Sequence, residues 1–434
     1  MAFTVGIVLF AVGILVAVCL HEAGHMLTAK WFGMRVTKYF AGFGPTIWSF
    51  KRGETEYGIK ALPFGGFVKI VGMTPQEDEI DPATGKSGAD DPRAMWRFPV
   101  WKRTIVMSAG SITHFALALT TLWVLFSFVG IPDPETKSED WPVRVGPVAQ
   151  CISTKWEYDP VTKGPKACDP AKDPKSPAAQ LGLKPGDLIV SVDGVAVPDS
   201  GTLREELKKV TDKTVAVTWT RDGKTMSGTV QIPEAERLKA DLPATKTFDQ
   251  ITAGDLEKGG LLGINIAPRT SDIPHVSYGP VEGVDKTFTI TWSLVERTFA
   301  SFKDIPEKVP NLFKAIFGEQ RDPETPVSVV GASRIGGELF ELGDWASLLL
   351  LFASLNLFFG IFNLFPLLPM DGGHIAIAWF ERLRSWFAAK LGKPDPGRVD
   401  YYKLAPITLG VIGILGVFVL LTVTADFVNP ITLK

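Results

Sequence analysis

The sequence predicts a multi-pass α-helical membrane protein with four transmembrane helices, a membrane-associated β-hairpin region and a separate water-soluble α+β domain. Four long stretches contain no Asp, Glu, Lys or Arg, and each is long enough to cross a bilayer as a helix: 2–20, 104–132, 345–370 and 404–425. Charged residues nevertheless make up 21% of the chain, too many for a bundle that lies wholly in lipid. The chain must therefore be divided between membrane and water.

The first apolar stretch runs directly into the motif H-E-x-x-H, formed by His21, Glu22 and His25. Residues four apart share one face of a helix, so the two histidines can offer imidazole nitrogens to one ion, and Glu22 can take a proton from water. Zn²⁺ fits best, because it is a Lewis acid without redox chemistry. A chance match is the alternative, but an ionisable group at the edge of an apolar helix is costly. The combination points to hydrolysis within the membrane.

A catalytic zinc has three protein ligands and one open position, so a third ligand is needed. Residues 363–374 read Asn-Leu-Phe-Pro-Leu-Leu-Pro-Met-Asp-Gly-Gly-His, in which the prolines break the helix and the glycines permit close backbone approach. Asp371 is the candidate third ligand, and His374 is interpreted as a supporting group. An ordinary helix end with a solvated Asp is the alternative, and pairing with the H-E-x-x-H motif makes it the weaker one.

Orientation follows from the basic residues, which are concentrated in 30–103 and 382–403, whereas acidic residues follow the second stretch and precede the third. The positive-inside rule places 30–103 and the loop after the third span in the cytoplasm. Both termini then face outward, and the active site lies toward the cytoplasmic side. No Lys or Arg precedes the first stretch, which argues against a cleaved signal peptide.

The cytoplasmic stretch 34–72 alternates around Arg52-Gly53 and predicts a β-hairpin, followed by a loop over 74–92. A protease must unwind a transmembrane helix to reach its peptide bonds, and an exposed sheet edge can hold the unwound strand. A plain surface hairpin is the alternative.

The outer segment combines short strands and helices over 141–235, further strand material over 248–282 and an amphipathic, aromatic stretch over 285–317. That last stretch is expected at the outer membrane interface, with a packed soluble helix as the competing view. The expected segments are a first span with the motif (1–32), a cytoplasmic β region and loop (33–103), a second span (104–132), an outer domain with an extra strand segment (133–284), interfacial helices and a connector (285–344), a third span (345–380), a cytoplasmic loop (381–403), and a fourth span with an outer C-terminus (404–434).

Cys151 and Cys168 flank an insertion rich in Pro, Lys and Asp on the predicted outer side, where disulfides persist. A disulfide is favoured over a metal site, because no histidine lies nearby. The net charge of −2 gives no indication of a nucleic-acid partner.

Taken together, these motifs resemble the site-2 protease family of intramembrane zinc metalloproteases. The resemblance is carried by His21 to His25, by the Asn-x-x-Pro and Asp-Gly-Gly elements of 363–373, and by residues 177–194, which look like part of a circularly permuted PDZ domain. The regulator of sigma-E protease type, in its single-PDZ actinobacterial form, is the most similar branch.

The resemblance implies His21, His25 and Asp371 as Zn²⁺ ligands, Glu22 as the base, and Asn363 as a group that binds substrate or stabilises the oxyanion. It also implies a bacterial cell membrane location and single-pass transmembrane substrates, with anti-sigma factors first cut by an upstream site-1-type protease as the leading candidates. The PDZ-like domain would bind peptides or act as a size filter. A catalytically silent membrane scaffold that senses extracytoplasmic peptides is the alternative function.

The sequence departs from this family at residues 109–114, Ala-Gly-Ser-Ile-Thr-His, where relatives usually have Gly-Pro-x-x-Asn. Ser111 and His114 replace the Pro and Asn. His114 is interpreted either as a buried histidine bonded to a neighbouring helix or as a group that contacts substrate or the site.

Overall fold

The computed structural model describes residues 1–73, 91–133, 135–160, 164–239, 242, 246–268, 272–319, 321–322 and 324–433. Two compact units form, one from Met1–Gly130 with Ser277–Leu433 and the other from Ile131–Val276. The loop predicted over 74–92 falls largely on 74–90, outside the described residues.

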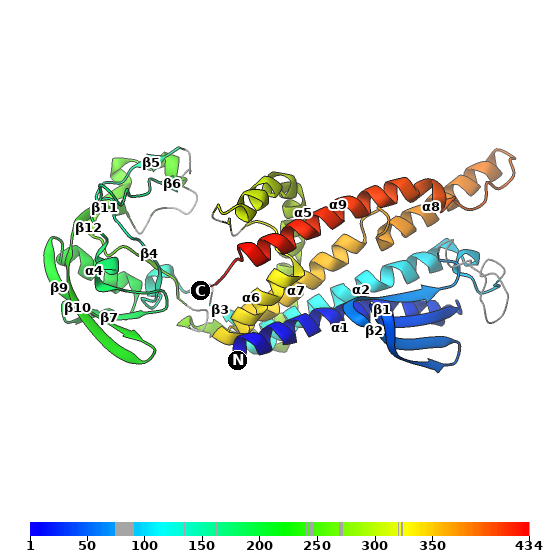
Figure 1. The fold of residues 1–434 in the computed structure, drawn as a ribbon, viewed down its shortest axis with the longest axis horizontal. Coiled ribbons are helices and arrows are strands. Elements are labelled where there is room, and N and C mark those ends of the chain that lie inside the picture. The colour runs from blue at the N-terminus through cyan, green and yellow to red at the C-terminus, as the bar shows by residue number, and fades with distance from the viewer. Residues whose placement is uncertain are drawn as a thin grey trace. The chain divides into compact units, whose positions relative to one another are not determined.

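The first unit is a helical bundle with one small sheet (Figure 1). Its elements are α1 (Ala2–Trp31), β1 (Val36–Arg52), β2 (Thr55–Ile70), α2 (Val100–Val124) with a π-helical extension (Leu125–Val129), α5 (Gly279–Ile316), α6 (Val329–Leu342), α7 (Trp345–Asn363), α8 (Asp371–Lys390) and α9 (Tyr401–Val428). Within the described residues, four helices are long and apolar enough to cross a membrane: α1, α2 with its extension, α7 and α9. They coincide with the four stretches that the sequence marks as apolar, so that prediction is confirmed.

Small residues let these helices approach closely, as is common where helices pack in lipid. A Cβ built on Gly24 of α1 would lie 2.7 Å from the carbonyl oxygen of Ala109 in α2. At the opposite end of α1, a Cβ on Gly6 would lie 2.9 Å from the Cα of Gly337 in α6. The backbones of α2 and α6 therefore lie against α1 at two different heights.

The third span, predicted over 345–380 with a break at its prolines, is divided into two helices. Helix α7 ends at Asn363, residues 364–370 are not helical, and α8 begins at Asp371. Pro366 and Pro369 account for the break, since proline lacks the amide hydrogen that a helix interior needs. Non-helical backbone at membrane depth is tolerated only where protein or a polar cavity surrounds it.

The hairpin predicted around Arg52-Gly53 is present, and it folds into more than a simple ribbon. Residues 36–41 of β1 pair with 66–70 of β2 on one side and with 56–59 on the other, while 46–52 pair with 55–60. The segment 66–70 is thus an outer edge of the sheet. Tyr39 donates a hydrogen bond of 2.8 Å to the carbonyl of Cys19, and Lys30 donates one of 2.6 Å to the hydroxyl of Tyr57, so the sheet is fixed to α1.

Helix α5 lies against α2, α7 and α9 in turn, rather than standing alone. Its Phe302 contacts the rings of Phe358, Phe362 and Phe365, with centroid distances of 5.5, 6.3 and 5.1 Å. Other large side chains of α5 are exposed, among them Trp292 at 66%. The helix is amphipathic, as the sequence predicts, and begins at Gly279 rather than at residue 285.

A buried ion pair holds the C-terminal end of α9. Arg321 lies 2.7 Å from Asp426, and both side chains are 2% exposed. The second oxygen of Asp426 accepts a 2.7 Å hydrogen bond from the amide of Ser328, which precedes α6. Elsewhere α9 is largely exposed. This pair therefore connects α9 to the rest of the unit.

The second unit is an α+β fold around a four-stranded sheet of order β10-β9-β7-β8. Its elements are β3 (Ile131–Pro132), β4 (Val145–Val148), β5 (Tyr158–Asp159), β6 (Gly164–Pro165), α3 (Pro177–Leu181), β7 (Leu188–Val192), β8 (Val195–Ala196), α4 (Ser200–Lys209), β9 (Lys213–Arg221), β10 (Lys224–Ile232), β11 (Glu234–Leu238), β12 (Leu256–Gly260), β13 (Ile264–Ile266) and β14 (His275–Val276). Helix α4 and the aliphatic faces of these strands enclose one core with Trp219. Cys151 and Cys168 form a disulfide. The resemblance to a PDZ domain stays a prediction.

We expect Arg321→Met to lower the free energy of unfolding by about 3 to 5 kcal/mol, because it leaves a buried carboxylate without its partner. Thermal unfolding of the purified protein in detergent measures this loss. Adding Asp426→Leu should recover most of it. Glu324→Gln is the control, because its pair with Lys308 is exposed and contributes at most about 1 kcal/mol. A loss as small as that of the control would show that the pair does not hold α9.

Asp187 gives a pH prediction for the second unit. Burial raises the pKa of this carboxyl group, but hydrogen bonds from Arg221 and from the amide of Lys184 outweigh it and hold the pKa below its usual value. The resulting stability is present above the unfolded pKa of about 3.9 and is lost as the pH falls through the folded pKa. Asp187→Asn should therefore destabilise this unit at pH 7 by about 1.5 to 3 kcal/mol. Calorimetry at falling pH should show the difference shrinking below about pH 3.9; an unchanged difference would contradict the assignment.

Candidate metal centre

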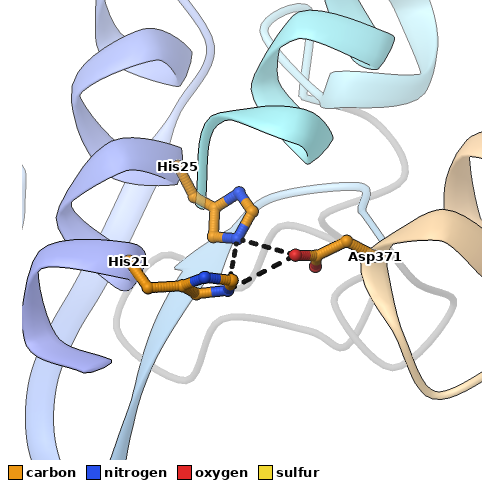
Figure 2. Close-up of side chains that lie close together, drawn as sticks. All are labelled: His21, His25 and Asp371. Carbon is orange, nitrogen blue, oxygen red and sulfur yellow. Dashed lines mark hydrogen bonds and ion pairs between the residues drawn. The ribbon is translucent and has the colours of Figure 1, made fainter. Parts of the chain in front are cut away.

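Figure 2 shows His21 and His25 one turn apart on α1, with Asp371 facing them from the start of α8. The two Nε2 atoms are 3.1 Å apart, and each lies 3.3 Å from Oδ2 of Asp371. Both histidines are buried, at 7% and 4% exposure. The structure thus brings together the three residues that the sequence marks as candidate ligands, although 346 positions separate His25 from Asp371.

The hydrogen bonding of His25 determines which of its nitrogens can bind a metal. Its Nδ1 lies 2.7 Å from the carbonyl oxygen of Val106 in α2. A carbonyl only accepts, so Nδ1 carries the hydrogen and Nε2 presents a lone pair to the cluster. Metal-binding histidines are commonly oriented in this way by a partner on the other nitrogen.

The cluster has the chemistry of a cation site. Lone pairs converge on one point, and Oδ2 of Asp371 is buried with no hydrogen-bond donor among the described residues. Tetrahedral Zn²⁺ with bonds of about 2.0 to 2.1 Å requires ligand atoms about 3.3 to 3.4 Å apart. The separations of 3.1 to 3.3 Å match this requirement. The donor set therefore fits Zn²⁺.

Glycines allow the surrounding backbone to come this close. A Cβ on Gly110 of α2 would lie 2.5 Å from both Cε1 of His21 and Nε2 of His25. On the opposite side, a Cβ on Gly373 would lie 2.6 Å from the backbone of Leu367 and Leu368. The glycines after Asp371 therefore let 364–368 fold back against the first turn of α8.

Glu22 lies between the cluster and the edge of the sheet. It is half-buried and interacts electrostatically with His25, His21 and Asp371. The backbone amide of Val68 faces its carboxylate, and a Cβ on Gly66 would lie 3.4 Å from its Cγ. The edge segment 66–70 consequently runs beside the candidate base.

The other predicted groups occupy different places. Asn363 ends α7 and is half-buried, eight positions before Asp371, and it is not one of the clustered residues. His374 is also outside the ligand cluster, and its Nδ1 lies 3.3 Å from the hydroxyl of Tyr401.

His114 is buried, is bonded to a neighbouring helix and lies beside a candidate ligand, and its role stays a prediction. Its Nδ1 lies 2.9 Å from Oδ1 of Asn356 in α7, and its ring centroid lies 5.0 Å from that of His21. Sequence reasoning missed the partners Val106, Asn356 and Tyr401. Only Asn356 carried a signal, as an isolated amide in an apolar span.

Comparison with known proteins agrees with this geometry. The profile of Peptidase family M50 matches residues 9–391. The chain belongs to this family. It is 39% identical to proteins named zinc metalloprotease Rip1 from Mycolicibacterium smegmatis and Mycobacterium tuberculosis, over 438 and 435 residues and the full length of both chains in each comparison. Membership of the M50 family and similarity to these relatives over the full chain identify the protein as a zinc metalloprotease. It is a hydrolase that acts on peptide bonds, with Zn²⁺ as its cofactor.

Removing one ligand from this M50 protein tests the cluster. Asp371→Ala should abolish stable zinc binding, because two histidines leave the ion under-coordinated. His374→Ala should only weaken zinc affinity, by about 10- to 100-fold, if it acts as a supporting group. Metal analysis of purified variants measures both, with the exposed Asp304→Ala as control. Full zinc occupancy in Asp371→Ala would transfer the ligand role to another residue.

Proposed function

We propose that the protein is an intramembrane endopeptidase that cuts single-pass membrane proteins within or near their transmembrane segments. His21, His25 and Asp371 would hold the Zn²⁺, and Glu22 would act as general base. The observation that carries this proposal is the convergence of His21, His25 and Asp371 beside Glu22, in helices apolar enough to lie in a membrane.

Each residue of the site has a part that follows from its position. When bound, Zn²⁺ polarises the scissile carbonyl and lowers the pKa of water to about 7. Glu22 takes the proton from the attacking water and later delivers it to the leaving amine. Val106 holds His25 in the tautomer that can bind the metal. Asn363 is proposed to bind the substrate near the scissile bond, on the strength of the family resemblance.

The sheet edge offers a way to hold the substrate. A helical peptide hides its peptide groups in its own hydrogen bonds, so cleavage requires an extended stretch. Residues 66–70 have strand 36–41 on one side, and no further strand pairs with them in the described part of the chain. Strand addition along this edge would pass the substrate backbone beside Glu22.

The orientation proposed for the chain places both termini outside the cell and the active site toward the cytoplasm. Aromatic and basic side chains support it at the inner ends of α1 and α2. Trp31 and Trp101 are 80% and 52% exposed, and Nζ of Lys102 lies 5.3 Å from the ring of Phe32 and 5.5 Å from that of Trp101. Such clusters favour a cytoplasmic membrane interface.

Anti-sigma factors that an upstream protease has already trimmed are the proposed substrates, by resemblance to the regulator of sigma-E protease type. The proposed outer domain, 133–284, would be PDZ-like and would dock or filter them. The alternative of a silent scaffold has less support, since membership of the M50 family accompanies a complete ligand set and a candidate base.

Glu22→Gln separates proton transfer from metal binding. We expect cleavage of a single-pass reporter in proteoliposomes to fall by at least about 10²- to 10⁴-fold, because only the general base is lost. Zinc content should stay near that of the wild type. Glu307→Gln, on the exposed side of α5, is the matched control. Normal cleavage by Glu22→Gln would rule out the proposed mechanism, and cleavage lost together with zinc would assign Glu22 to the ligands.

A further inference from the structure

A buried histidine and asparagine connect α2 to α7 next to the candidate metal centre. His114 and Asn356 are each 2% exposed, and Nδ1 of the histidine lies 2.9 Å from Oδ1 of the asparagine. Both residues interrupt apolar spans, where polar side chains are costly and are usually functional. The mechanism above uses neither of them.

The hydrogen bonding fixes which atom donates. The amide nitrogen of Asn356 donates a 2.9 Å hydrogen bond to the carbonyl of Phe352, so its Oδ1 is the atom that faces His114. An amide oxygen only accepts, and Nδ1 of His114 therefore carries the hydrogen. The direction of this hydrogen bond is therefore fixed: His114 donates and Asn356 accepts.

His114 is the last of three positions on one face of α2 that contact the candidate ligands. Val106, Gly110 and His114 follow one another at intervals of four residues, which aligns them along the helix. Val106 accepts the hydrogen bond of His25, and Gly110 makes room for both imidazole rings. The His114 ring lies 5.0 Å from that of His21, between centroids. This face of α2 therefore contacts and orients the two histidines of α1.

The hydrogen bond to Asn356 links this face of α2 to the helix that leads to Asp371. Helix α7 leads into 364–370 and then to Asp371, so the position of α7 against α2 sets where the carboxylate arrives. A metal centre tolerates only small errors in ligand placement. A hydrogen bond between α2 and α7 at this height restricts their sliding along each other.

We propose that His114 and Asn356 are positioning residues of the zinc centre, which hold α7 against α2 so that Asp371 meets His21 and His25. This inference rests on the proposed ligand set. It assigns to His114 a role at the site without contact with the metal.

A matched pair of variants tests it. In asparagine, Nδ2 is separated from Cβ by the same number of bonds as Nδ1 is in histidine, so His114→Asn keeps a donor for Asn356. His114→Leu has similar size and no donor. We expect His114→Leu to weaken zinc affinity by about 10- to 100-fold in chelator competition. His114→Asn should stay close to wild type, which a role in filling space alone would not produce.

Asn356→Leu and the double variant separate positioning from stability. Asn356→Leu leaves a buried donor unpaired and should weaken zinc affinity as His114→Leu does. His114→Leu combined with Asn356→Leu leaves no unpaired group, so the midpoint of thermal unfolding should recover while zinc affinity stays low. The visible spectrum of the Co²⁺-substituted protein should change in His114→Leu and not in His114→Asn, because it reports ligand geometry.

Three results would overturn the inference. These are wild-type zinc affinity in His114→Leu, equal losses of zinc affinity in His114→Asn and His114→Leu, and recovery of zinc affinity together with stability in the double variant. Thr287→Val is the control for a buried hydroxyl outside the ligand cluster. Asp371→Ala tests the ligand set separately. If it keeps zinc, the proposed function fails, whereas loss of zinc there with unchanged binding in His114→Leu rejects only the positioning role.

Discussion

The first unit is organised around the close approach of three buried electron-rich atoms, two imidazole nitrogens and one carboxylate oxygen. His21, His25 and Asp371 bring two imidazole nitrogens and a carboxylate oxygen to within 3.3 Å, an arrangement that a shared cation stabilises. Burying polar groups is costly unless they find partners, so the surrounding protein must hold these groups in place. Zinc provides the compensation once bound. Much of the packing near the site can be understood as a means of bringing the ligands together.

The break between α7 and α8 follows from the same constraint. An Asp in the middle of a continuous span would be fixed by the helical repeat, whereas an Asp at the start of α8 can be aimed by the non-helical residues before it. Pro366 and Pro369 end one helix, and Gly372 and Gly373 allow the chain to fold back against the next. The positive end of the α8 dipole also favours the Asp371 carboxylate. The prolines and glycines thus position the ligand without touching it.

Much of this could be predicted from the sequence, because the main signals are local. Absence of charge identifies the four spans, a spacing of four identifies the histidine pair, and Gly with Pro marks the broken helix. The partners that orient the site had no such signals. Val106 acts through a carbonyl oxygen that every residue has, and Tyr401 reaches His374 across 27 positions of chain. The outer edge at 66–70 was also not predictable, since it depends on β1 pairing with β2 twice.

Two buried polar pairs connect segments of the first unit, and they differ in charge and in location. Arg321 and Asp426 pair at the C-terminal end of α9, outside the cluster of candidate ligands, and several backbone groups complete their hydrogen bonds. That pair anchors a helix that is otherwise mostly exposed. His114 and Asn356 join α2 to α7, and the His114 ring lies against that of His21. A neutral pair suits this location, because a full charge beside the two imidazoles would change their electrostatic interaction with Asp371. Of these two connections, the charged pair anchors a helix and the neutral pair lies beside the candidate ligands.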